Sequence, residues 1–297
     1  MKKTQTLSIL FELIRSFTSL ADTLNLSKTV RNLGSTRQTV RRHIRLLEER
    51  MGETLFTLED RQYHLTEAGV RALPQAQDLL VSGEAWLNNA TGHINGLAHI
   101  NYEDDPKFSY YLQQHPLGRI WQDGSPLLQQ AFQCWAEAKG ELDAEAFAPI
   151  RPYLVVYRQL ENSWICVDVG QESSFAKWQG WRWARSSVGT EIPDLPGGAG
   201  FANLLRQPFR DVRDQGTVRL DHIHTQLPDQ SGAEMVPISF QRLLMACRFP
   251  DGAFALGSLV VRTYDIGIHG VSDAMVRTMP EKFTMDGNSV DLKKTPI

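Results

Sequence analysis

The sequence predicts an α+β protein in which a small helical unit with a β-hairpin precedes a larger domain built on an antiparallel sheet. Apolar residues recur at helical spacing up to about residue 94. From residue 153 onward, β-type runs alternate with turn residues. A chain of 297 residues is also long enough for two domains.

The composition is that of a packed protein rather than a disordered one, with 42% hydrophobic and 22% charged residues. Glu12 and Arg15 interrupt the apolar N-terminal run, so we expect no export signal. No segment approaches the roughly 18 apolar residues that span a membrane. Three widely spaced cysteines, with no CxxC pair, favour reduced thiols. We therefore expect a cytoplasmic protein with no membrane contact.

The charge is uneven along the chain. Residues 1–71 hold 12 Lys and Arg against 8 Asp and Glu, whereas the remainder holds 19 against 26. A basic first quarter on an acidic body favours a nucleic-acid-binding module joined to a second domain.

The N-terminal part predicts three helices. Residues 7–20 form the first, and Ser27 is placed to cap a second that ends near Leu33 and turns at Gly34. A third helix over 37–51, capped by Ser35 or Thr36, ends at Gly52. Its apolar face, at helical spacing, consists of Val40, Ile44, Leu47 and Met51.

A hairpin and a long helix follow. Residues 58–65 predict two short strands that turn near Asp60, and Thr66 with Glu67 begins a helix that runs to about Ile94, with Pro74 inside it. Such a helix can serve as a dimerisation arm or pack within its own domain.

The helix over 37–51 carries the candidate chemistry on its polar face. Arg37, Arg41 and Arg45 recur at one-turn spacing, with Gln38 and Arg42 beside them. The planar guanidinium binds phosphate or the edge of guanine, and glutamine can pair with adenine. A preceding helix and tight turn let such a helix enter a major groove. The alternative interpretation is a solvated basic face.

Residues 24–80 resemble the winged helix-turn-helix of LysR-type transcriptional regulators. The segments that carry the resemblance are IRLLEERMGETLF at 44–56 and LTEAG at 65–69. The resemblance implies binding to double-stranded DNA, with Arg61 in the wing, and a homodimer or higher oligomer formed through the helix from Thr66. The recognition-helix positions it implies are Thr36, Arg37, Gln38, Arg41 and Arg42.

Two features depart from the family pattern. Thr29 and Val30 stand where the family usually has alanines, and the wing reads Glu59-Asp60-Arg61 rather than opening with arginine. Two acids near phosphate weaken backbone contact. The departures therefore bear on which DNA sequence is bound.

Beyond a linker expected at 99–118, the pattern predicts a helix over 125–139, strands at 153–157 and 164–169, a helical middle over 172–216, and three more strands. The last two strands are joined by the turn Pro250-Asp251-Gly252. Two strands, helices and three strands predict a five-stranded antiparallel sheet. The last three strands span 218–227, 238–249 and 254–264.

Residues 120–265 resemble a divergent PAS domain. The segments that carry this are the helix with Trp135, PIRPYLVVY at 149–157, and FQRLLMACRFPDGAFALGSLVV at 240–261. The resemblance implies a domain that binds a small ligand, holds haem or flavin, or dimerises; the sequence requires no particular cofactor. The predicted organisation is 1–65 winged helix-turn-helix, 66–98 dimerisation helix, 99–118 linker, 119–268 PAS-like domain, and 269–297 tail.

Candidate ligand residues in this domain are few. His222 and His224 flank Ile223 on a strand and so share one face, which fits either a ligand site or a polar strand surface. Trp178, Trp181 and Trp183 cluster, with Trp164 nearby in the sequence, and these four could line an aromatic pocket or pack in a core. No paired nucleophile and base is present, so we expect no enzyme and no metal site.

The favoured hypothesis is a dimeric, sequence-specific transcription regulator whose C-terminal domain senses a small molecule or partner. A second hypothesis keeps the DNA-binding dimer and gives the C-terminal domain only an assembly role. A third is an enzyme with a DNA-binding regulatory domain.

Overall fold

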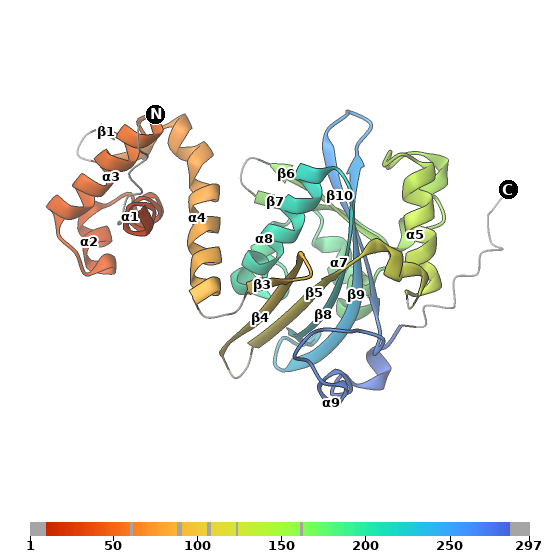
Figure 1. Cartoon of the computed structure of the whole chain (residues 1–297). Helices are drawn as coiled ribbons and strands as arrows, with labels where there is room; N and C mark the ends of the chain where they lie inside the picture. The colour runs from red at the N-terminus through yellow and green to blue at the C-terminus, as the bar shows by residue number, and fades with distance from the viewer. Residues whose placement is uncertain are drawn as a thin grey trace. The chain divides into compact units, whose positions relative to one another are not determined.

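The computed structural model describes residues 10–59, 62–87, 91–105, 108–122, 124–160 and 163–285. The chain divides into two compact units, Met1–Leu87 and Asn88–Ile297 (Figure 1). No helix in these ranges is long and apolar enough to cross a membrane.

The first unit is a helix-turn-helix with a hairpin. Asn25, rather than the expected Ser27, caps the second helix, because its side chain accepts hydrogen bonds from the backbone N–H groups of Ser27 and Lys28. Gly34 ends that helix at φ +58°, where glycine is favoured. The elements are α1 (Leu10–Thr23), α2 (Leu26–Leu33), α3 (Arg37–Met51), β1 (Phe56–Glu59), β2 (Gln62–Leu65) and α4 (Glu67–Leu87).

The core of this unit is formed by one face of each helix. Leu13 and Phe17 of α1 pack against Val40 and Leu47 of α3, and all four are buried. Met51, which we expected on the same face, is 43% exposed. It is the last residue of α3, where the chain turns away at Gly52. The expectation for Met51 was therefore wrong.

The second unit is built on one antiparallel sheet with the strand order β3-β4-β5-β8-β9-β10-β6-β7. The five predicted strands are contiguous at one side of it. The strands are β3 (Thr91–Ile94), β4 (Leu97–Asp105), β5 (Phe108–His115), β6 (Leu154–Leu160), β7 (Ser163–Val169), β8 (Val218–Pro228), β9 (Met235–Arg248) and β10 (Phe254–Arg262).

The eight strands correct the prediction of five. Residues 99–118, expected as a linker, hold most of β4 and β5, because Tyr110 and Leu112 face the core and are completely buried. The long helix ends at Leu87, and β3 occupies part of the range expected as helix. In the expected tail, α9 (Asp273–Val276) is helical and Met279 is buried; residues 286–297 lie outside the described residues.

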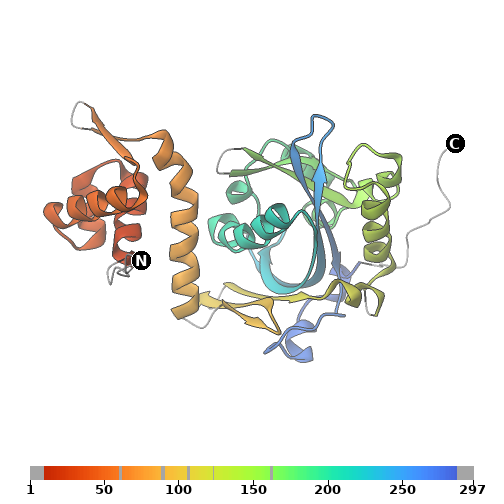
Figure 2. The ribbon, with the colours of Figure 1, turned by 45° about the horizontal axis from the view of Figure 1, so that its top comes forward.

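Helices cover both faces of the sheet (Figure 2). On one face α5 (Pro126–Glu137) packs through Leu127, Leu128 and Ala131. On the other face a second core contains Leu205 and Phe209 of α8. The covering elements on this face are α6 (Ser174–Gln179), α7 (Trp181–Ser186), the 3-10 turn η4 (Ile192–Asp194) and α8 (Gly198–Gln215). We call it the α8 face of the sheet.

Candidate nucleic-acid interface

The exposed face of α3 is fixed by contacts at the start of the helix and on its buried side. Thr36 is the N-cap, and its hydroxyl accepts from the Thr39 N–H at 3.1 Å. On the buried side, the Ser16 hydroxyl of α1 lies 2.8 Å from His43 Nδ1. Burial lowers the pKa of His43, and the positive charge of Arg42 lowers it further. The contact between a neutral His43 and Ser16 therefore holds α3 against α1.

All six predicted residues of this helix and its cap are exposed. Arg37 donates to the Ser27 hydroxyl at 2.8 Å, which fixes its side chain against α2. Arg45 forms an exposed ion pair with Glu49 across 3.4 Å. Within the described residues, Arg41 and Arg42 form no hydrogen bond or ion pair, so both guanidinium groups are available. The six residues are Thr36, Arg37, Gln38, Arg41, Arg42 and Arg45.

The hairpin lies directly after α3. Glu48 accepts hydrogen bonds from the backbone N–H groups of Leu55 and Phe56, at 2.8 and 3.3 Å, and so positions the start of β1. The strands pair from Phe56 with Leu65 to Glu59 with Gln62. Arg61 lies outside the described residues. Glu48 is not identifiable from the sequence, and Ser27, expected there only as a helix cap, instead accepts from Arg37, because both roles depend on contacts between elements.

The two candidate ligand histidines of the second unit are internal. His222 and His224 are both buried on the same sheet face. His222 Nδ1 accepts from the Gly267 N–H at 2.9 Å, and His224 Nδ1 lies 2.8 Å from the Ser239 hydroxyl. Burial lowers the pKa of His222 to about 2, and His115 and Arg119 contribute. Across the described ranges, no three His, Cys, Asp or Glu residues form a metal-binding group.

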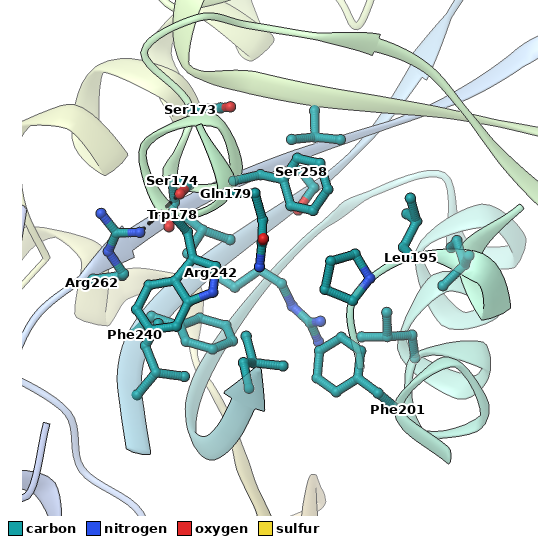
Figure 3. Close-up of a pocket in the computed structure, with 18 of the residues that line it drawn as sticks. Ser173, Ser174, Trp178, Gln179, Leu195, Phe201, Phe240, Arg242, Ser258 and Arg262 are labelled. Atoms are coloured by element: carbon teal, nitrogen blue, oxygen red, sulfur yellow. Dashed lines mark hydrogen bonds between the residues drawn. The ribbon is translucent and has the colours of Figure 1, made fainter. Parts of the chain in front are cut away.

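The tryptophans named from the sequence do not line a common pocket. Trp164 packs edge-on against Phe209 at 5.4 Å, while Trp181 and Trp183 are 44% and 36% exposed. Trp178, the fourth tryptophan named from the sequence, does line a cavity, which has a volume of about 130 Å³ and lies on the α8 face (Figure 3).

Two arginines of this cavity, Arg242 and Arg262, were not identified from the sequence. Each lies on a strand between apolar residues of the same face, and both side chains are almost completely buried. A charged residue at such a position could have indicated the site from the sequence, because arginine is almost never fully buried unless it is paired.

Comparison with known proteins concerns mainly the first unit. Residues 11–70 match the family model of the bacterial regulatory helix-turn-helix protein, lysR family. The HTH-type transcriptional activator AllS of Salmonella paratyphi A is 41% identical over 78 residues, which are 26% of this chain and 24% of that protein. AllS of Klebsiella pneumoniae is 34% identical over 83 residues, 28% of this chain and 29% of that protein. The chain thus spans about a quarter of the length of these relatives.

Solved structures match over a similar share. The oxidized form of Corynebacterium glutamicum OxyR aligns with 23% identity and a TM-score of 0.26, covering 28% of this chain and 26% of that one. A complex of the CbnR DNA-binding domain with DNA aligns with 24% identity and a TM-score of 0.25, covering 27% of this chain and 92% of that one. From the family match and the observed elements, the N-terminal unit is a helix-turn-helix domain of the lysR family.

Proposed function

We propose that this protein is a cytoplasmic transcription regulator that binds specific double-stranded DNA as a homodimer. The observation that carries the proposal is the exposed face of α3, where Arg41 and Arg42 are free beside Gln38 in a lysR-family helix-turn-helix. The matched relatives are named as transcriptional activators.

In this proposal the N-terminal half of α3 enters the major groove. Arg41 and Arg42 contact guanine edges or phosphates, since a guanidinium can donate two parallel hydrogen bonds to either. Arg37, fixed by Ser27, and the helix N-terminus behind Thr36 favour a phosphate position. Gln38 pairs with adenine, and Arg61 approaches the DNA from the wing.

The dimer contact is assigned to the helix that begins after Thr66. On α4, Leu79 and Leu87 are 58% and 67% exposed. Burying such side chains against a second copy would stabilise a dimer by removing apolar surface from water. Two copies would present two α3 helices to a pseudo-palindromic site.

The C-terminal unit is proposed to be a PAS-like sensor. Five strands are contiguous in the sheet in the order β7-β6-β10-β9-β8. In the chain, α6 to α8 lie between β7 and β8. This arrangement of two strands, helices and three strands supports the likeness to a PAS domain. A C-terminal core without a cavity would have favoured the second hypothesis, in which this domain has only an assembly role. The cavity on the α8 face favours sensing. A ligand can shift the dimer only if it binds one arrangement more tightly than another.

The test is fluorescence anisotropy of the full chain on labelled duplexes from upstream of its own gene, titrated with salt. We expect tight binding to one duplex, weaker binding to a scrambled duplex, and a steep loss of affinity as salt rises. Equal, salt-insensitive or absent binding to all duplexes would contradict the proposal. Sedimentation of the protein with the bound duplex gives the stoichiometry, which we expect to be two chains per site.

A further inference from the structure

The cavity on the α8 face has an apolar wall with a charged floor. Its floor is formed by β9 and β10, whose register places Arg242 opposite Val260 and Arg262 opposite Phe240. The two arginines are therefore diagonal neighbours on one face. Trp178 and Phe201 are among the side chains that line it (Figure 3), together with Phe209. Such walls fit an organic group rather than a bare inorganic ion.

Arg262 is a buried cation without an acidic partner among the described residues. Its side chain donates only to main-chain carbonyls, from Nε to Phe283 O at 2.7 Å and from Nη1 to Ser174 O at 2.9 Å. Burial lowers its pKa to about 10, so it remains charged at neutral pH. Since a guanidinium has five N–H donors, three are left for another acceptor. A buried charge with no counter-charge costs free energy, which a bound anion would recover.

Arg242, in contrast, is already neutralised. Its Nη2 donates to Asp221 at 2.8 Å, Asp221 also accepts from Arg219, and Arg219 reaches Asp211 at 2.6 Å. Two arginines and two aspartates form a set with no net charge. The uncompensated charge at the described cavity wall is therefore the single positive charge of Arg262, which calls for a monoanion.

The size of the cavity limits the ligand. Its volume is about 130 Å³. An engineered protein cavity of roughly 150 Å³ accommodates benzene. The organic part of a ligand would therefore be about one aromatic ring or a short aliphatic chain. Ser258, on the same face of β10, adds a neutral hydroxyl to the lining.

We propose that this cavity binds a small organic monocarboxylate, with its carboxylate on Arg262 and its apolar body against Trp178 and Phe201. Calling it the effector site rests on the regulator function proposed above. The binding site itself does not, so it is tested without DNA, and the two proposals can fail separately.

The probes are benzoate and its neutral isostere benzamide, titrated calorimetrically into the full chain with tryptophan fluorescence as a second readout. We expect benzoate to bind at least about tenfold more tightly than benzamide, because a charge-assisted bidentate pair is stronger than a neutral hydrogen bond. Equal affinities, or no binding of either probe, would overturn the proposal.

Variants locate the contact. Arg262→Gln should remove the preference for benzoate, whereas Arg262→Lys keeps a positive charge and should retain part of it. The matched control is Arg248→Gln, because Arg248 lies on β9 but is exposed and pairs with Glu141. It should leave both affinities unchanged. If Arg262→Gln still preferred benzoate over benzamide tenfold, Arg262 would not be the carboxylate-binding residue. If that variant does not fold, the ratio of the two affinities in the wild type and in Arg262→Lys tests the proposal instead.

Discussion

Arg242 and Asp221 face each other across β9 and β8 as a buried ion pair, with Nη2 2.8 Å from Oδ2. Arg219 donates to the other carboxylate oxygen, also at 2.8 Å. Because Asp221 is completely buried, its charge is solvated by these two guanidinium groups rather than by water. The carboxylate is therefore the centre of the charged layer beneath the cavity.

Replacing Asp221 by asparagine should destabilise the C-terminal unit strongly. Two buried guanidinium groups would lose their shared carboxylate, and breaking one buried pair typically costs roughly 3–5 kcal/mol. Urea unfolding followed by near-UV circular dichroism measures this. The matched control is Asp251→Asn, which alters the exposed pair with Arg158 and should change stability little. Equal stability of both variants would contradict the role of Asp221.

Gly69 should not tolerate even a methyl group. A Cβ at this position would collide with the carbonyl oxygen of Leu55, where α4 begins against the hairpin. Gly69→Ala should cost roughly 1–3 kcal/mol through overpacking and lower the melting temperature of the N-terminal unit. Gly92→Ala is the control, because a Cβ there meets nothing within 4 Å. A stable Gly69→Ala variant would show that the contact is not close in solution.

Stability should fall with acid because of His222. Its pKa is about 2 in the folded protein and near 6.5 in an unfolded chain. Below pH 6.5, His222 binds a proton in the unfolded chain but not in the folded protein. The stabilising contribution is thus complete above pH 6.5 and declines as pH falls toward 2, by up to about 1.4 kcal/mol per pH unit.

Thermal unfolding between pH 7.5 and 5 tests this expectation. His222→Gln keeps an acceptor for the Gly267 N–H and should reduce the acid dependence, although the lowered pKa of His43, His99 and His224 leaves part of it. His64→Gln, on the exposed surface of β2, should have the wild-type slope. Identical slopes for His222→Gln and wild type would refute the assignment.

The first unit could be predicted closely because its signals are local. Gly34 and Gly52 both end helices in the left-handed conformation expected from the sequence. The sequence predicts Ser27 as the cap of α2, whereas the structure has Asn25, since either side chain can accept from the helix N-terminus and only backbone geometry distinguishes them.

The second unit depends on contacts between distant segments, which a local pattern does not contain. The sequence predicts a linker at 99–118, yet this segment contains β5, whose partners β4 and β8 lie more than 100 residues apart in the chain. The cavity escaped prediction for the same reason. Arg242 and Arg262 become a site only once β9 and β10 place them on one face beneath α6 and α8.

We expect α3 to bind DNA through its free arginines, and anisotropy of three full-length variants on the preferred duplex measures their contribution. Arg41→Ala and Arg42→Ala should each weaken binding by roughly 1–3 kcal/mol. Arg248→Ala, which removes the same charge from the C-terminal unit, should bind like wild type. Wild-type affinity in both α3 variants, with all three proteins folded, would show that these arginines do not bind the DNA.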